Sequence, residues 1–294
     1  MNSKTKRVAK DILFKFFSWP FDFGIDSEPR ILGYHSIGDG QSKISTPAER
    51  FRKQIEWLLA HGWRIYTLRD WWNLTIAEGK PPKRSAVLTF DDGFRGVFLN
   101  AAPILADYGL AGTVFLVAEA IGQSNAFDCA RGVPQLALMG WDEIFKLKNM
   151  GWDIQSHGKR HNPMAGVSRE SLEDEIVGSK NLIEKKLGGR VDFFCYPYGV
   201  FDEEAVMIVE RAGYRAAVTC WAGTASNEAI FHRYRLRRVM ADGLHSESDL
   251  AFRFSPAYRK LSKIWFWGRH KLGRDSECLL SEFDKTFNRI LPTT

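Results

Sequence analysis

The sequence predicts a single α/β domain built as a deformed (β/α) barrel of seven to eight parallel strands. Its 294 residues are enough for one large hydrophobic core. Short apolar runs with strand character alternate along the chain with runs of helical spacing, which is typical of a parallel sheet covered by helices. Polar side chains follow several of the strand-like runs, at the ends where barrel enzymes carry their chemistry. A doubly wound open sheet is the alternative architecture.

The predicted strands are short apolar runs bounded by glycine, proline or polar residues. The run at 86–90 follows a Pro-Pro pair and leads into two aspartates. The run at 152–156 follows Gly151 and leads into a histidine. The predicted strands span residues 31–35, 64–68, 86–90, 113–117, 152–156, 191–196, 214–219 and 236–240.

The predicted helices are bounded by capping residues and glycines. The segment Thr46-Pro47-Ala48-Glu49 has the form of a capping box with proline at the first helical position, and Gly62 closes that helix. A long amphipathic helix begins at Ser168 and ends before Gly188. Further helices are predicted before Gly109, at residues 70–78, at residues 141–150 and from Asp202 to Gly213, whereas residues 120–138 are predicted to form a loop.

The four cysteines exclude two kinds of small scaffold. Cys129, Cys195, Cys220 and Cys278 are far apart and form no CxxC pair. This spacing is not that of a zinc finger or of a disulfide framework. Cys195 and Cys220 lie in apolar runs, so we expect them to be small core residues.

The positive charge is concentrated at the two ends of the chain, which carries a net charge of +6. Residues 1–15 hold five basic side chains and one aspartate, and residues 256–274 hold six basic side chains and no acid. Both ends are also rich in phenylalanine and tryptophan. We therefore divide the chain into a basic and aromatic extension (1–29), a barrel domain (30–255) and a basic and aromatic tail (256–294).

These ends predict either contact with a membrane surface or packing against the barrel. Lysine and arginine mixed with aromatic residues suit an anionic membrane surface, and flanking helices packed on the barrel are an equal alternative. Lys15 interrupts the first apolar run, which makes a poor signal peptide, and no run approaches the ~20 residues that span a bilayer. We expect a cytoplasmic protein, or a peripheral one at the cytoplasmic face of the inner membrane. No nucleic-acid partner is expected, because the barrel is not basic, and the oligomeric state is left open.

Two pairs of residues predict a catalytic metal site. Asp91 and Asp92 follow one strand, and His157 and His161 follow another. Adjacent aspartates can be no more than a turn with a helix cap, and histidines four apart can be surface residues. Both pairs at strand ends favour a joint site instead. One carboxylate and two imidazoles supply three ligands to a metal, and the second carboxylate is free to act as a base, which suits metal-assisted hydrolysis.

Three motifs in this order resemble those of the polysaccharide deacetylases, carbohydrate esterase family 4. They are Thr89-Phe90-Asp91-Asp92-Gly93, His157-x-x-x-His161 and Tyr196-Pro197-Tyr198-Gly199. Gly33-Tyr34-His35-Ser36 and Arg235-Leu236-Arg237-Arg238-Val239 resemble the branch acting on exported or lipid-linked N-acetylglucosamine polymers. The resemblance extends from about residue 31 to about residue 254.

The resemblance implies an enzyme that removes N-acetyl groups from sugars with a divalent metal ion. That ion would be Zn²⁺, with Co²⁺, Ni²⁺ or Fe²⁺ as alternatives. Asp92, His157 and His161 would be its ligands and Asp91 the general base. The backbone N–H of Tyr198 would stabilise the oxyanion. Residues expected to contact the substrate are Tyr198, Pro197 and Arg238.

The chain departs from the family pattern at two positions. Cys195 stands where the third motif usually carries an arginine that pairs with the base, so Arg235 or Arg238 is the candidate replacement. The usual late histidine is absent, and Val239-Met240-Ala241-Asp242 stands in that region. His35, at the end of the first strand, is the candidate general acid or substrate contact. A hydrogen-bonded packing role for His35 is the alternative.

The sequence therefore predicts a hydrolase acting on non-peptide carbon–nitrogen bonds, a carbohydrate N-deacetylase whose substrate is a sugar polymer or a lipid-linked glycan. An O-deacetylase would use the same machinery. Because the usual arginine and late histidine are missing, a glycan-binding homologue with weak or no activity is one alternative. A non-haem iron oxygenase is another, because two histidines and one carboxylate are also its iron ligands.

Overall fold

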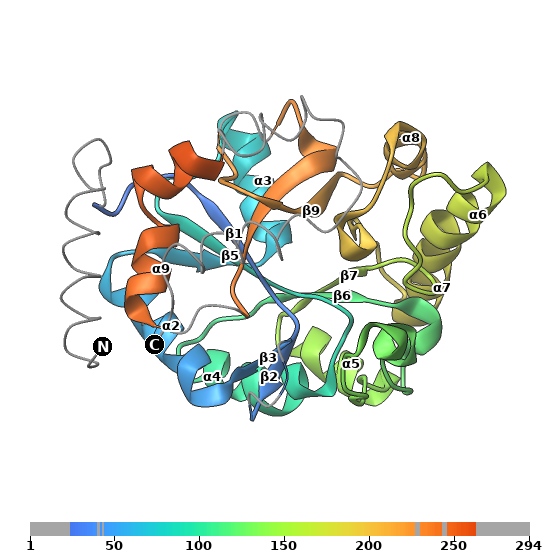
Figure 1. Cartoon of the computed structure of the whole chain (residues 1–294), viewed down its shortest axis with the longest axis horizontal. Coiled ribbons are helices and arrows are strands. Elements are labelled where there is room, and N and C mark those ends of the chain that lie inside the picture. The colour runs from blue at the N-terminus through green and yellow to red at the C-terminus, as the bar shows by residue number, and fades with distance from the viewer. Residues whose placement is uncertain (1–23, 40–41, 43, 227–229, 243–245, 263–294) are drawn as a thin grey trace, which may run out of the picture.

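The computed structural model of the protein describes residues 24–39, 42, 44–226, 230–242 and 246–262. In these residues a closed barrel of seven parallel strands forms the centre of the molecule (Figure 1). The pairing of β1 with β5 closes the barrel, which confirms the predicted fold class and excludes the open sheet. In order around the barrel, the strands are β1 (Arg30–Tyr34), β10 (Leu236–Met240), β9 (Ala216–Ala222), β8 (Phe193–Cys195), β7 (Asp153–Ser156), β6 (Thr113–Leu116) and β5 (Ser85–Phe90).

An additional strand lies outside the closed barrel. β4 (Arg64–Tyr66) pairs with the first half of β5, with Arg64 opposite Ser85, whereas β6 pairs with the second half of β5. The two strands therefore share one edge of β5, and only β6 continues around the barrel. Two short strands, β2 (Ser36–Gly38) and β3 (Ser45–Pro47), form a separate two-stranded sheet after β1.

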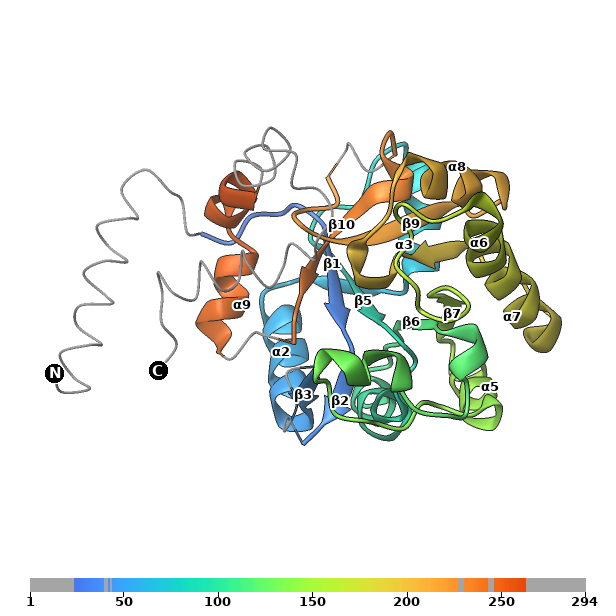
Figure 2. The same cartoon turned by 45° about the vertical axis from the view of Figure 1, so that its right-hand side comes forward.

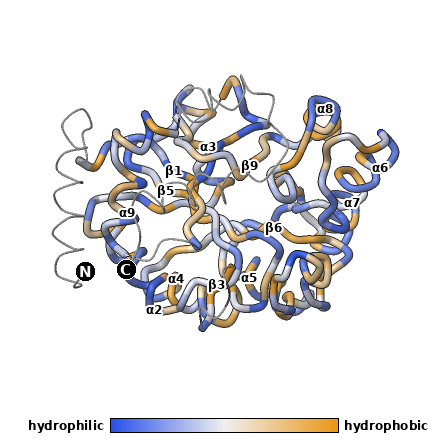
Figure 3. Tube along the Cα trace, viewed as in Figure 1, coloured by the Kyte–Doolittle hydropathy of each residue, from blue (hydrophilic) through white to orange (hydrophobic). Residues whose placement is uncertain are grey.

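The helices surround the barrel on its outside, as Figures 1 and 2 show. Apolar stretches are frequent along the central strands, and hydrophilic stretches are frequent at the periphery of the molecule (Figure 3). No helix in the described residues combines the length and the apolar character needed to cross a membrane. The α-helices are α2 (Ala48–Ala60), α3 (Leu68–Glu78), α4 (Ala102–Ala106), α5 (Trp141–Asn149), α6 (Arg169–Glu173), α7 (Ser179–Leu187), α8 (Glu203–Arg211) and α9 (Glu247–Arg253).

The helix boundaries agree with the capping signals at most positions, and Thr46 is the exception. α2 begins at Ala48 with Pro47 as the preceding residue, and no side chain caps it, so the predicted capping box is wrong. Thr46 lies in β3 instead, where the hydroxyl donates a hydrogen bond to Asp242 at 3.3 Å. At α8 the Asp202 side chain accepts from the N–H of Ala205, as predicted.

The long amphipathic helix predicted at 168–187 contains a wider turn in its middle. Ser168 caps α6, and the chain continues through the π-helical turn η4 (Asp174–Gly178) into α7. Gly188 ends α7 with a left-handed backbone, φ 61°. A π-turn inside a helix changes the direction of the side chains that follow, and such turns occur at functional sites.

Helix α3 closes the barrel at the amino ends of the strands. Trp71 and Trp72 are buried in the same hydrophobic cluster as inward-facing strand residues such as Val87 and Phe193. Arg69 bonds to Asp153, at the start of β7, and to Asp192 just before β8. Because this end is packed with side chains, the opposite, carboxyl end of the strands is the one available for chemistry.

Candidate active site

The residues singled out in the sequence meet at the carboxyl ends of the barrel strands. Asp91 and Asp92 follow β5 and His157 follows β7. His161 lies four residues further along, in the loop after β7. The side chains of Asp91, Asp92, His157 and His161 are all buried. Four polar side chains that are withdrawn from water in one place need charge or hydrogen-bond compensation, which points to a functional site.

Asp92, His157 and His161 have the spacing of metal ligands. Asp92 Oδ1 lies 3.4 Å from His157 Nε2 and 3.2 Å from His161 Nε2, and the two nitrogens are 3.2 Å apart. A tetrahedral ion with ligands at about 2.0–2.1 Å places its ligand atoms about 3.3 Å from one another. Asp92 Oδ1 is buried and has no hydrogen-bond partner within the described part of the chain. The three atoms therefore fit a tetrahedral ion such as Zn²⁺.

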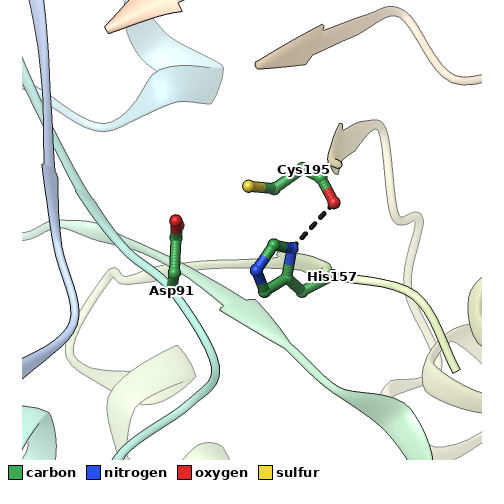
Figure 4. A group of neighbouring side chains, drawn as sticks. All are labelled: Asp91, His157 and Cys195. Atoms are coloured by element: carbon green, nitrogen blue, oxygen red, sulfur yellow. Dashed lines mark hydrogen bonds between the residues drawn. The ribbon is translucent and has the colours of Figure 1, made fainter. Parts of the chain in front are cut away.

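His157 is held in the orientation that a metal ligand needs. Its Nδ1 lies 2.7 Å from the carbonyl oxygen of Cys195, so Nδ1–H donates to that carbonyl and Nε2 keeps its lone pair (Figure 4). Burial lowers the pKa of His157 to about 4, although Asp91 and Asp92 act against this. The imidazole is therefore neutral at pH 7, as a ligand must be.

A second group of potential ligands overlaps the first but is a poor metal site. Asp91, His157 and Cys195 offer ligand atoms within 4.8 Å of one another. The Arg238 guanidinium already bonds to Asp91 and lies 3.2 Å from the Cys195 sulfur, so a second cation there would be repelled. Burial raises the pKa of the Cys195 thiol well above its usual value, and the protonated thiol is a weak ligand.

Backbone strain is concentrated in the same residues. Four non-glycine residues in the described part of the chain have a left-handed backbone, and three of them are Asp92 (φ 67°), His161 (φ 67°) and Tyr198 (φ 56°). Such a conformation costs about 1–3 kcal/mol and persists where the surroundings impose it, often at active sites. The backbone conformation at these three positions is an observation separate from the side-chain distances, and it indicates the same place in the molecule as the functional site.

Asp91 forms a two-point ion pair with Arg238. Arg238 Nη1 donates to Asp91 Oδ1 at 2.8 Å and Nη2 to Oδ2 at 2.6 Å, and both residues are buried. Burial alone would raise the pKa of Asp91, but the charge and hydrogen bonds of Arg238 outweigh it and hold that pKa well below its usual range. Asp91 is therefore a carboxylate at all but strongly acidic pH.

Arg238 is itself fixed by strands on several sides. Its Nε donates to the carbonyl oxygen of Thr219 at 2.9 Å, and Nη1 donates to the hydroxyl of Thr89 at 3.0 Å. Of the two arginines considered as replacements for a third-motif arginine, Arg238 is the one that reaches Asp91. Arg235 pairs with Glu203 at the surface. A guanidinium from β10 thus lies against the thiol of Cys195.

Replacing Arg238 by methionine should destabilise the protein by about 3–5 kcal/mol at pH 7, because the charge of Asp91 would be buried without a partner. In the wild type the lowered pKa of Asp91 contributes stability above pH ~4 that is lost as the pH falls further. In Arg238→Met, burial should raise the pKa of Asp91, so protonation below that pKa should remove the penalty. Denaturant unfolding at pH 7 and pH 5 measures this, with a smaller difference from the wild type at pH 5.

The double variant Asp91→Asn/Arg238→Met is the matched control. It removes both charges and should recover part of the lost stability. A double variant as unstable as Arg238→Met would show that the packing of Arg238, and not its charge, stabilises the fold.

His35 lies beside the aspartates and pairs with Asp242. The carbonyl oxygen of Tyr34 accepts the backbone N–H of Asp91 at 2.8 Å, so the end of β1 is adjacent to the end of β5. His35 Nδ1 lies 2.5 Å from Asp242 Oδ2, and the backbone N–H of His35 donates to Asp242 Oδ1 at 3.1 Å. Burial lowers the pKa of His35, but Asp242 more than reverses this and raises it to about 10.

Tyr198 and the segment predicted as a loop at 120–138 pack against His161. The rings of Phe127 and Tyr198 both have their centroids 4.4 Å from that of His161. The Tyr198 hydroxyl donates to Asp128 at 2.8 Å, and the Arg131 guanidinium lies over the Tyr198 ring at 3.7 Å. The segment begins at the end of the short helical turn η2 (Ala118–Ala120) and contains the turn η3 (Ala126–Arg131), which carries these contacts. Pro197, the residue before Tyr198, is buried.

Several residues at the site carry no clear signal in the sequence. Phe127, Asp128 and Arg131 lie in a segment without periodicity, so nothing local connects them to the histidines. Asp242 could have been found, because it follows β10 as the aspartates follow β5. In the sequence, however, its region stands out only as the place of a missing histidine.

The chain is similar in sequence and in fold to polysaccharide deacetylases. Residues 78–217 match the family model described as polysaccharide deacetylase. The chain is 27% identical over 214 residues to YxkH of Bacillus subtilis strain 168, with 72% of each chain covered. It is 25% identical over 217 residues to the poly-β-1,6-N-acetyl-D-glucosamine N-deacetylase of Staphylococcus epidermidis, covering 70% of this chain and 72% of that protein.

A solved structure shows the same fold. The deacetylase PplD of Streptococcus pyogenes, solved in complex with acetate, superposes with a TM-score of 0.67 at 21% identity and covers 79% of this chain and 100% of that one. The match to the family model includes the Asp91–Asp92 and His157–His161 pairs and Tyr198. Residues 78–217 therefore form a polysaccharide deacetylase domain of the kind found in carbohydrate esterase family 4, whose members hydrolyse the N-acetyl amide bonds of sugars.

Proposed function

We propose that this protein is a zinc-dependent N-deacetylase that acts on N-acetylglucosamine units of a polymer or of a lipid-linked glycan. One observation carries the proposal above the others. The ligand atoms of Asp92, His157 and His161 lie 3.2–3.4 Å apart, and Asp91, the next carboxylate, is held ionised beside them by Arg238. A metal site and a separate base are what the hydrolysis of an unreactive amide requires.

Asp92, His157 and His161 would hold the ion. A bound Zn²⁺ would polarise the acetamide carbonyl and make water acidic enough to react at neutral pH. Co²⁺, Ni²⁺ and Fe²⁺ can be bound by the same nitrogen and oxygen ligands, so availability would also influence the ion present. The bond from His157 Nδ1–H to the Cys195 carbonyl keeps Nε2 directed at the ion.

Asp91 is suited to act as the general base. Its carboxylate has an oxygen within 4.8 Å of a His157 nitrogen, and Arg238 binds both of its oxygens. A base must accept the proton of the attacking water as the tetrahedral oxyanion forms. The backbone N–H of Tyr198, in a left-handed turn after β8, would donate to that oxyanion.

His35 is suited to act as the general acid. Amide hydrolysis ends with the departure of an amine, which must be protonated as it leaves. With a pKa raised to about 10 by Asp242, His35 carries a proton throughout the neutral range. Its position at the end of β1, adjacent to β5, places it on the same side of the barrel as Asp91.

The substrate class is supported by the sequence relatives. The Staphylococcus epidermidis relative is named for the deacetylation of poly-β-1,6-N-acetyl-D-glucosamine, and the match covers 70% of this chain. Contact with an anionic membrane surface, and a place at the cytoplasmic face of the inner membrane, are the finer part of the proposal. They depend on the two ends, 1–29 and 256–294, of which residues 1–23 and 263–294 lie outside the described residues, whereas Tyr258 is buried in the hydrophobic core.

The decisive experiment measures acetate released from N-acetylglucosamine oligomers by the zinc-loaded protein, with the new free amines located by mass spectrometry. A chelator should abolish release, and zinc should restore it. O-acetylated oligomers, run in parallel, distinguish N- from O-deacetylation. Metal-independent binding of the oligomers without any release would support the glycan-binding alternative, and oxygen consumption with iron would support the oxygenase.

The pH dependence of kcat/KM should report the His35–Asp242 pair. Since the pKa of His35 is raised to about 10, activity should fall only as the pH rises through that value. Asp242→Asn removes the charge that raises this pKa, while burial continues to lower it, so the alkaline limb should move down by about 1–3 pH units. An alkaline limb at the same pH in the variant would show that another group supplies the proton.

A further inference from the structure

One buried carboxylate next to the site takes no part in the mechanism above. Glu175 lies in the π-helical turn η4, and only 3% of its surface is exposed. A buried carboxylate needs several hydrogen-bond donors to offset its loss of hydration. The groups that donate hydrogen bonds to the Glu175 carboxylate therefore show which part of the chain this residue fixes in position.

All of these donors belong to the segment that connects and follows the two metal-ligating histidines. The backbone N–H groups of Lys159 and Arg160 both donate to Glu175 Oε2 at 2.9 Å. The Asn162 side-chain amide donates to Oε1 at 3.0 Å, and Arg160 Nη1 reaches Oε1 at 3.3 Å. Successive backbone N–H groups that converge on one oxygen form an anion-binding nest, here filled by a side chain of the same protein.

The loop around this carboxylate has a conformation that needs support. Gly158 and His161, on either side of the two donating residues, have φ values of 83° and 67°. A Cβ at position 158 would lie 3.1 Å from Glu175 Oε2, so the loop closes tightly on the carboxylate. Two residues with a left-handed backbone thus flank the dipeptide Lys159–Arg160, whose N–H groups Glu175 binds, and this dipeptide lies between His157 and His161.

We propose that Glu175 is a positioning residue for the metal site: by binding the backbone between His157 and His161, it sets the spacing of their Nε2 atoms. The proposal rests on the metal site proposed above. In this role Glu175 contacts neither the metal nor the substrate. Substitution of Glu175 should therefore lower the affinity for the metal before it affects anything else.

Asp174, the neighbouring residue, provides a matched control. Its carboxylate bonds to the side chains of Lys159 and Arg160, at 2.6 and 2.7 Å, and is 43% exposed. It thus shares with Glu175 the ion-pair partner Arg160, and pairs with Lys159 as well, but it accepts from neither backbone N–H group of the loop. Substitutions of Glu175 and of Asp174 can therefore be compared. The comparison distinguishes the effect of the hydrogen bonds to the loop backbone from the effect of the ion pairs.

The experiment measures the affinity of the full chain for zinc by competition with a chromophoric chelator, and the denaturant unfolding of the metal-free protein. We expect Glu175→Ala to lower zinc affinity by about tenfold or more, as substitutions behind a metal ligand do. Glu175→Gln, whose amide oxygen can still accept from the two N–H groups, should recover part of that loss. Asp174→Ala should change the affinity by less than about threefold, because it loses only exposed ion pairs.

Three results would overturn the proposal. Unchanged zinc affinity in Glu175→Ala, with lower stability of the metal-free protein, would reduce Glu175 to a structural residue. If Asp174→Ala lost as much zinc affinity as Glu175→Ala, the effect would come from the loss of negative charge and not from the loss of the backbone hydrogen bonds. Absence of zinc binding by the wild type would overturn this inference together with the metal site, whereas either of the first two results would overturn this inference alone. If Glu175→Ala does not fold, Glu175→Gln against Asp174→Asn makes the same comparison.

Discussion

Asp91→Asn should keep its zinc and lose turnover by roughly 10²–10⁴-fold, the usual contribution of a general base. Asparagine has the shape of aspartate but cannot accept the proton. The three atoms that would bind the metal belong to Asp92, His157 and His161, so the substitution of Asp91 leaves them in place. Elemental analysis should find the same zinc content as in the wild type. Acetate release should fall in kcat, with little change in KM.

The control for this experiment is a measurement of the stability of the Asp91→Asn variant. In Asp91→Asn the introduced amide would face the Arg238 guanidinium, so the loss of an ion pair could also lower stability. Unfolding of the variant should therefore be measured alongside its activity. Normal acetate release by a folded Asp91→Asn protein would show that another residue is the base.

Asp92→Asn should lose both the metal and the activity, because its carboxylate would be the charged ligand of the three. His157→Ala, which removes a nitrogen ligand and leaves the carboxylate in place, should behave in the same way. We expect about one zinc per chain in the wild type and little in either variant, as structural and catalytic zinc sites need three or four ligands. Elemental analysis of the purified proteins measures this directly.

The identity of the bound metal also distinguishes the three functions considered. Zinc in the wild type and none in the variants supports the deacetylase. Iron in the wild type would revive the oxygenase, since the ligand set is compatible with both. Absence of any metal after reconstitution would contradict the hydrolytic mechanism and leave glycan binding as the better account.

The sequence predicts most of the fold because strands and helices have local signals. Apolar runs and capping residues placed the barrel strands close to where they lie, and Asp202 and Gly188 bound their helices as predicted. Closure of the barrel through β1 and β5 is different, because it depends on the pairing of strands far apart in the sequence. The same holds for β4, whose residues resemble a barrel strand but pair with only half of β5.

The position of Arg238 shows a similar limit to what the sequence can predict about the site. Residues 236, 238 and 240 share one face of β10, and 237 and 239 share the other, whereas Arg235 lies in the turn that precedes the strand. Leu236 and Val239 are both apolar, so the sequence does not say which face points into the barrel, and Arg235 and Arg238 were equal candidates. In the structure, Leu236 belongs to the inner cluster, and Arg238 follows it inward to Asp91.

The ion pair of Asp91 and Arg238 also has a consequence for how the protein acquires its activity. The two residues are 147 positions apart in the sequence and come from β5 and from β10, the last strand of the barrel. Contacts of such long separation carry a large loop-closure entropy cost, so we expect them to form late in folding. A chain that has not yet inserted β10 has the aspartate without its counter-charge. The ability to hydrolyse substrate should therefore arise in the same step that completes the barrel, and a partly folded chain would bind no glycan productively.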